Sequence, residues 1–161
     1  MSRRCPDEGS WLVNLVKAES ISPVLFTERT SAGLGYIYEG ERNSIGQPHG
    51  QGNMKFENGD YYSGSWFKGK LHGSASAKIL VDADSNNYKA YKGEFQNGKQ
   101  HGFGKFTWPD GEFYEGQWHN GLFHGYGIYG TPDGVSTQCS FSKGLPEIGS
   151  TCQVAAPRHR C

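Results

Sequence analysis

The sequence has no excess of charge of either sign. Its 161 residues contain 16 lysines and arginines against 16 aspartates and glutamates, so the formal net charge is zero. Proteins that bind nucleic acid usually carry a clearly basic surface, because they neutralise phosphate groups. The charge balance therefore argues against a nucleic-acid-binding protein.

Long hydrophobic runs are missing as well. No stretch approaches the about 20 apolar residues that a helix needs to cross a bilayer. The N-terminal MSRRCPDEGS has two arginines but lacks the apolar region of a signal peptide. The four cysteines form no paired pattern; they are Cys5, Cys139, Cys152 and Cys161. This arrangement is typical of reduced thiols, and we expect a cytoplasmic protein.

Apolar residues are scarce, whereas aromatic residues and glycine are abundant. Hydrophobic residues make up 35% of the sequence, aromatic residues make up 14%, and glycine accounts for 24 positions. An ordinary aliphatic core is hard to build from this composition, yet disordered chains are poor in aromatic residues. We therefore expect a folded protein with a core of aromatic side chains and glycine.

An internal repeat organises most of the chain. Each repeat opens with a tyrosine two residues before a glycine and closes on a His-Gly dipeptide. The tyrosines are Tyr38, Tyr62, Tyr91 and Tyr114, and the dipeptides begin at His49, His72, His101 and His124. Successive dipeptides lie 23, 29 and 23 residues apart, and a linker from Val81 to Tyr88 accounts for the longer interval. A partial fifth unit keeps Phe141 and Gly144 but has Cys139 at its first glycine position.

The repeats predict an all-β fold. Tyr114, Gly116 and Trp118 alternate with polar residues, which is the period of a strand with two different faces. Pairs such as Asn120-Gly121 and Asn58-Gly59 predict tight hairpin turns with both residues at positive φ. We expect a single-layer, twisted antiparallel meander of β-hairpins that forms an elongated trough. In it, a tyrosine or tryptophan of the next repeat lies over bare glycine backbone.

The repeat pattern, Y-x-G-x-[WF]-x-x-G-x-x-H-G-x-G, resembles the MORN repeat. It is clearest in YKGEFQNGKQHGFG, residues 91–104, and YEGQWHNGLFHGYG, residues 114–127. Four full copies and a partial fifth cover about residues 36–148, with Arg42 replacing an aromatic residue and Ala75 a glycine. Residues 1–35 are an N-terminal extension that either caps the first strand or docks a partner. Residues 149–161 are predicted to form a flexible tail.

The sequence predicts no catalytic, cofactor-binding or metal site. Histidines of successive repeats lie about 9–10 Å apart in such a sheet, too far to share a zinc ion, so we expect a structural role at the turns. Residues 125–130, GYGIYG, match G-x-G-x-x-G, but a turn follows them in place of a helix. Ser136, Ser140 and Cys139 have no partner base at a fixed spacing. We therefore expect no enzyme and no cofactor.

The resemblance implies a non-enzymatic scaffold or adaptor that binds a partner protein along the trough. A groove of aromatic residues suits an amphipathic helix or an extended peptide, since aromatic side chains dominate binding energy. The candidate residues are the repeated aromatics Tyr62, Trp66, Tyr91, Phe95, Tyr114 and Trp118. A single-layer sheet must also bury one aromatic face for its own stability, so the same residues are candidates for the core.

The resemblance also carries implications for location and partners. Many MORN proteins belong to cilia and flagella, and residues 40–50, GERNSIGQPHG, are similar to the irregular opening repeat of radial-spoke-head members. This implies an axonemal or other cytoskeletal assembly and a protein partner within it. The alternative is a membrane-associated, phosphoinositide-binding adaptor. Its candidate lysines are interspersed with acidic residues; they are Lys68, Lys70, Lys89, Lys92, Lys99 and Lys105. Some relatives associate end to end, which leaves dimerisation open.

Overall fold

The structure, a computed structural model, describes residues 35–82, 87–148 and 152–155. The strands are β1 (Tyr36–Arg42), β2 (Pro48–Phe56), β3 (Tyr61–Phe67), β4 (Lys70–Asp82), β5 (Asn87–Gln96), β6 (Lys99–Thr107), β7 (Phe113–His119), β8 (Leu122–Gly130), β9 (Ser136–Ser142), β10 (Leu145–Pro146) and β11 (Gln153–Ala155). Within these ranges there is no helix long and apolar enough to pass through a bilayer.

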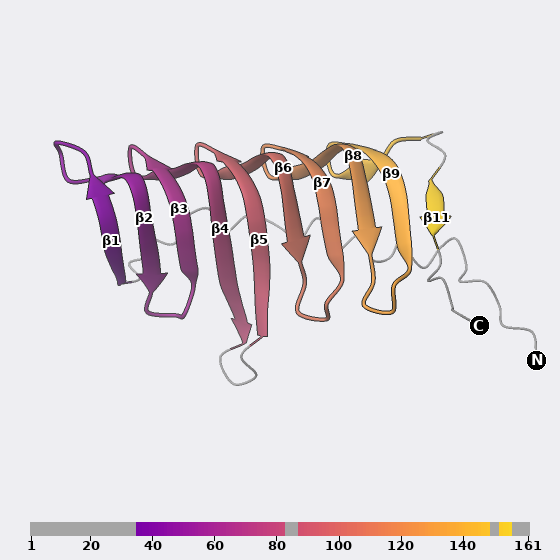
Figure 1. The fold of residues 1–161 in the computed structure, drawn as a ribbon, viewed down its shortest axis with the longest axis horizontal. Coiled ribbons are helices and arrows are strands. Elements are labelled where there is room, and N and C mark those ends of the chain that lie inside the picture. The colour runs from indigo at the N-terminus through magenta and orange to yellow at the C-terminus, as the bar shows by residue number, and fades with distance from the viewer. Residues whose placement is uncertain (1–34, 83–86, 149–151, 156–161) are drawn as a thin grey trace, which may run out of the picture.

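All the strands belong to one antiparallel sheet. The strands from β1 to β10 follow one another in sequence order, each hydrogen-bonded to the next, and β11 pairs with β9. Figure 1 shows β1 to β9 side by side along the long axis of the molecule. The predicted all-β meander of hairpins is confirmed.

A bulge interrupts the two strands of each of the four repeats. The register shifts directly after Gly40, Gly64, Gly93 and Gly116. A bulge bends its strand and increases the local twist, so bulges in register curve the whole sheet in one direction. The curvature accounts for the trough form that the repeats predict.

The turns within the repeats have the predicted geometry. Both residues lie at positive φ, from 48° to 85°, in Lys68-Gly69, Asn97-Gly98, Asn120-Gly121 and Lys143-Gly144. This is the type I′ conformation, whose twist matches that of the flanking strands. The first repeat has one extra residue and forms a longer loop, in which the side chain of Asn43 accepts the N–H groups of Ile45 and Gln47.

The turns between the repeats differ from the prediction. Only the glycine lies at positive φ in Asn58-Gly59, Asp110-Gly111 and Asp133-Gly134. In the loop between β6 and β7, for example, the Trp108 N–H donates to the Glu112 carbonyl at 2.8 Å. A type I turn followed by a left-handed glycine closes such a three-residue loop. The expectation of two positive φ angles is therefore wrong here.

The additional residues between the second and third repeats lengthen the hairpin formed by β4 and β5. β4 continues to Asp82 and β5 begins at Asn87, with Leu80 opposite Tyr88. The predicted linker is therefore wrong for residues 81, 82, 87 and 88, which are strand, while residues 83–86 lie outside the described ranges. The buried carboxylate of Asp60 accepts the Leu80 N–H at 2.9 Å and joins this extension to the preceding turn.

One face of the sheet, here called the core face, carries the buried side chains. Most of them are aromatic, and the strands from β2 to β9 contribute to them. The core consists of Met54, Phe56, Tyr62, Trp66, Leu71, Ala75, Ala77, Tyr91, Phe95, Phe106, Trp108, Tyr114, Trp118, Phe123, Tyr129, Cys139 and Phe141. The rings of Tyr114 and Phe123 stack with centroids 3.7 Å apart, and most other ring pairs meet edge to face. The predicted aromatic core is confirmed.

Tyrosine rings lie over the glycines of their own repeat. A Cβ atom at Gly104 would lie 2.5 Å from Cζ and 2.7 Å from Cε2 of Tyr91, so only glycine leaves room for the ring. Trp118, by contrast, reaches back to the preceding repeat and donates its indole N–H to the Gly104 carbonyl at 3.0 Å. We expected a tyrosine or tryptophan of the next repeat to lie over the glycine backbone. This is right for tryptophan and wrong for tyrosine, whose ring covers the glycines of its own repeat. Tyr91 and Gly104 lie on the paired strands β5 and β6.

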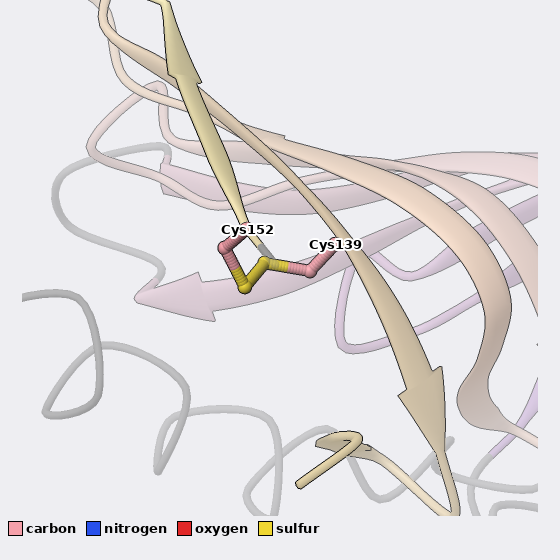
Figure 2. The surroundings of a disulfide bond; sticks show 2 residues. All are labelled: Cys139 and Cys152. Carbon is pink, nitrogen blue, oxygen red and sulfur yellow. A yellow bond between two sulfur atoms is a disulfide. The ribbon is translucent and has the colours of Figure 1, made fainter. Parts of the chain in front are cut away.

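A disulfide bond closes the C-terminal end of the sheet. Cys139 of β9 is bonded to Cys152, just before β11, with the Cα atoms 4.6 Å apart (Figure 2). The interpretation of reduced, unpaired thiols is wrong for these two cysteines, because β11 folds back beside β9 and brings them together. The flexible tail is likewise wrong for residues 152–155. Residues 1–34 and 156–161 lie outside the described ranges, so the N-terminal cap stays a prediction.

Loss of the disulfide is expected to lower stability. The two cysteines are 13 residues apart, and closing a loop of that size stabilises a fold by about 2–3 kcal/mol. We expect the Cys152→Ser variant to lose this amount in urea unfolding of the full chain. A reducing agent should bring the wild type to the same stability and leave the variant unchanged. Equal stability of both proteins without reductant would contradict the assignment.

Candidate protein-binding surface

The six aromatic residues predicted for partner binding all lie on the core face. None of them is more than 6% exposed, and Tyr114 is fully buried. Trp118 contacts Tyr91, Tyr114 and Phe123, with ring centroids 4.9–5.3 Å apart. The structure thus brings the six together as packing residues of the sheet. A direct contact between any of them and a partner stays a prediction.

Hydrogen bonds fix the buried tyrosines to the bulges. The Tyr91 hydroxyl donates to the Glu94 carbonyl at 3.0 Å, and the Tyr114 hydroxyl donates to the Gln117 carbonyl at 2.9 Å. Burial raises the pKa of both phenols above the ordinary tyrosine value, and for Tyr91 the neighbouring Glu94 adds to the increase. The neutral hydroxyl is therefore the form that the fold requires.

The raised pKa values predict a loss of stability in alkali. A phenol whose folded-state pKa is raised stabilises the fold fully below its unfolded pKa of about 10, and this contribution is lost as the pH rises further. We expect the free energy of unfolding to fall steeply above that pH and the near-ultraviolet circular dichroism to disappear as tyrosinate forms. The Tyr114→Phe variant should show a shallower fall, whereas Tyr126→Phe, at an exposed position, should match the wild type. Equal pH dependence of all three proteins would contradict this account.

The opposite side of the sheet, here called the outer face, carries the side chains that alternate with the core. One row of paired residues crosses it from β3 to β8: Ser63, Ser76, Lys92, Lys105, Glu115 and Ile128. A second row joins Tyr61, Lys78, Ala90, Thr107 and Phe113. Several large apolar side chains are exposed on this face, with Phe103 at 61% and Tyr126 at 64%.

A hollow of about 750 Å³ lies on the outer face between β3 and β7. Large side chains border it, whereas Ser76, Ala90 and Gly93 lie between them and leave the space open. A second hollow of about 400 Å³ adjoins it and shares Ser76, Gly93 and Phe103 with the first. We call the two together the groove and define it by Tyr61, Lys78, Ala90, Lys92, Phe103 and Lys105.

The charges in the groove are only partly balanced. Lys105 forms an ion pair with Glu115 at 3.2 Å, and its ammonium lies 4.0 Å from the centre of the Phe113 ring. The carboxylate of Glu94 accepts the Phe103 N–H at 3.2 Å. Lys92 is exposed and forms neither an ion pair nor a ring contact within the described part of the chain. The groove therefore combines apolar side chains with a lysine, Lys92, whose charge no described residue pairs.

The repeated histidines lie near the turns, in two arrangements. The Nδ1 atoms of His49 and His72 are each 3.5 Å from the backbone nitrogen of a turn residue in the following hairpin. The rings of His101 and His124 lie on either side of His119, with centroid distances of 4.9 and 5.4 Å. The predicted structural role at the turns is confirmed for His49 and His72. Across the described ranges, no group of three metal-ligating side chains could hold an ion.

The G-x-G-x-x-G segment and the candidate nucleophiles lie in strands of the sheet. Residues 125–130 lie in β8, and the side chain of Gln117 accepts the Tyr126 N–H at 3.0 Å. A turn and β9 follow this segment, so no helix N-terminus faces its glycines. Cys139 is part of the disulfide, and Ser136 and Ser140 lie on either side of it in β9.

The candidate lysines for a membrane surface lie in different parts of the sheet, and only Lys92 and Lys105 are paired neighbours on the outer face. Lys68 lies in the turn between β3 and β4, and Lys70 and Lys99 lie at the starts of β4 and β6. Lys105 lies in the groove on the outer face and is paired with Glu115. An anionic membrane would require these charges on one common plane.

The groove is the feature that the sequence analysis missed. The internal repeat points to the aromatic positions, and the groove residues lie between those positions. The sequence does contain one indication of the groove, namely the residues that alternate with the core positions. Among them, Ser76 and Ala90 are small, whereas Tyr61 and Phe103 are large and exposed. Their meeting on one face depends on the strand register, which the sequence does not give directly.

Comparison with protein families agrees with the repeat units described above. The MORN repeat model matches the chain four times, at residues 44–61, 62–76, 91–113 and 114–136. Three of these matches begin at tyrosines that open a repeat: Tyr62, Tyr91 and Tyr114. None of the curated proteins compared with the chain matches it.

Proposed function

The chain belongs to the MORN-repeat family, and we propose from this premise that it is a non-enzymatic scaffold that binds a partner protein. Repeats of this kind are typical of proteins that bind other proteins or associate with membranes. The observation that carries the proposal is the exposed apolar surface of the outer face at the groove, which includes Tyr61 and Phe103. Large apolar side chains gathered in a groove mark interaction sites, and stacked repeats provide extended surfaces for them.

The burial of the repeated aromatics supports different roles for the two faces: the core face stabilises the sheet, and the outer face binds the partner. Tyr91, Tyr114 and Trp118 hold the sheet together on the core face. The outer face is left for recognition, because its side chains are not needed to bury the aromatic core. The partner therefore contacts the groove in this proposal, and not the repeated aromatic residues of the core face.

We place the protein in the axoneme of cilia or flagella, or in another cytoskeletal assembly of the cytoplasm, on the family resemblance alone, because the Cys139–Cys152 disulfide removes the argument from reduced thiols. The likeness of residues 40–50 to the opening repeat of radial-spoke-head members supports it. In this chain that segment contains an extra residue, and Asn43 holds its loop by hydrogen bonds to Gln47. The partner in this setting is an axonemal or cytoskeletal protein.

Fractionation of the tagged full chain in a ciliated cell tests the proposal. Mild detergent removes the membranes, and high salt then extracts the axonemes. We expect the protein to stay with the axonemes through the detergent step, where chemical cross-linking identifies its neighbour. Retention in a non-axonemal cytoskeletal fraction would support the scaffold and overturn the axonemal placement.

A membrane-associated, phosphoinositide-binding adaptor is the second candidate. It follows from the same family, and the exposure of Lys68, Lys70 and Lys105 is the observation that favours it. Release of the protein into the detergent phase would support this candidate against the scaffold. Neutralising Lys68, Lys70, Lys99 and Lys105 together should then abolish binding to vesicles that contain phosphoinositides.

A further inference from the structure

The groove combines three properties that restrict what it can bind. Tyr61 and Phe103 border a hollow whose floor consists of serine, alanine and glycine. The second hollow shares Ser76, Gly93 and Phe103 with the first and extends the groove toward Ser63 and Ser74. A groove of this shape can hold a peptide segment whose side chains enter the hollow. A partner with a flat surface would contact only the residues at the border of the groove.

The electrostatics of the groove favour an anionic ligand. Three lysines line it, against the single carboxylate of Glu115 in the larger hollow, and that carboxylate is already paired with Lys105. The Glu94 carboxylate of the smaller hollow is held by the Phe103 N–H. Lys92 lies in both hollows. Positive charge thus remains where the two hollows meet.

We propose that the groove binds an acidic peptide segment of a partner protein that carries aromatic or aliphatic side chains. Apolar side chains of the segment occupy the hollow between Tyr61 and Phe103, and its aspartate or glutamate side chains pair with Lys92 and Lys78. Charge complementarity of this kind selects partners and speeds their association. The inference rests on the proposed protein-binding function and specifies the partner for it.

A peptide fits these observations better than a lipid surface does. The groove lysines surround a hollow lined by apolar and small residues, whereas a bilayer surface would meet exposed lysines on a common plane. The ammonium of Lys105 is held between the Phe113 ring, 4.0 Å from its centre, and the Glu115 carboxylate at 3.2 Å, so it is less available to a lipid headgroup. A chain segment can place both an apolar side chain and a carboxylate within this space.

Selection from a library of short random peptides displayed on phage, with the full-length protein as bait, tests the inference. We expect the enriched peptides to be acidic and to contain aromatic or aliphatic residues. The Lys92→Glu and Phe103→Ser variants should bind them at least about tenfold more weakly, since a reversed charge repels the peptide and a lost ring removes its apolar contact. Both variants should keep the wild-type melting temperature, because both side chains are exposed.

Matched controls come from the same sheet. Lys70→Glu changes a lysine outside the groove, and Tyr126→Ser removes an exposed aromatic residue of the outer face outside it. Both should bind the selected peptides as the wild type does. Neutral or basic enriched peptides, no enrichment, or equal binding by the groove variants would overturn the inference.

Two further measurements separate this inference from the proposed function. If wild type and Lys92→Glu capture the same cross-linked neighbour in cells with equal yield, the scaffold stands and the groove is not its binding site. If the wild type captures no protein neighbour and enters the detergent phase, the scaffold itself fails. Lys92-dependent binding to phosphatidylcholine vesicles containing phosphatidylinositol bisphosphate, without peptide binding, would assign the groove to a lipid headgroup and overturn the inference.

Discussion

Replacing Trp118 with alanine is expected to lower the free energy of unfolding by about 3–5 kcal/mol. The ring is 2% exposed and packs between the aromatic side chains of two repeats, Tyr91 on one side and Tyr114 on the other. Its indole N–H also donates to the Gly104 carbonyl, which would lose its partner. Equilibrium urea unfolding of the full chain, followed by circular dichroism, measures the loss.

A substitution on the outer face provides the control for this prediction. Phe103→Ala removes a ring that is 61% exposed, and we expect a change within about 0.5 kcal/mol. Phe95→Ala, on the core face, should behave like Trp118→Ala because Phe95 is 6% exposed and packs on Tyr91. Lost partner binding with unchanged stability in Trp118→Ala would instead identify a contact residue.

Replacing Gly127 with valine is expected to cost a similar amount, about 3–5 kcal/mol, because it displaces a core ring. A Cβ atom at this position would lie 2.5 Å from Cζ of Tyr114, which is fully buried and cannot move aside. The loss arises from this contact and not from backbone strain, since Gly127 is not among the glycines at positive φ. Thermal and urea unfolding both measure it.

Two variants isolate the cause of this loss. Gly46→Ala adds a Cβ atom that meets nothing within 4 Å but lies at a φ of 81°, so we expect only the left-handed penalty of about 1–2 kcal/mol. Combining Gly127→Ala with Tyr114→Leu should cost less than the sum of the two single changes, because the smaller side chain relieves the contact. Strict additivity would show that Tyr114 does not pack on Gly127.

The fold could be predicted from the sequence because one pattern recurs. The alternation of Tyr114, Gly116 and Trp118 determines the faces of the strand, and Asn120-Gly121 has the turn geometry that its residue types favour. Each repeat supplies the same information independently, so one irregular residue such as Ala75 changes little. The aromatic composition likewise identified the chemistry of the core.

The parts that could not be predicted depend on contacts between distant positions. The Cys139–Cys152 bond requires that β11 pair with β9, and no local sequence pattern predicts that these two strands pair. The positive-φ pairs predicted between repeats failed because Asn-Gly suits two kinds of hairpin loop, and the strand register decides between them. For the binding surface, the repeat pattern reveals the aromatic residues, but only the register places Tyr61 and Phe103 around one hollow.

The central claim is that the repeated aromatics hold the sheet and that the outer face recognises the partner. Oxidative footprinting by mass spectrometry, on the full chain with and without an acidic peptide from the selection, tests it most directly. We expect Trp118 and Tyr114 to be protected in both states, and Phe103 to be oxidised readily alone and protected by the peptide. Ready oxidation of Trp118 in the free protein, with protection only on binding, would contradict the account.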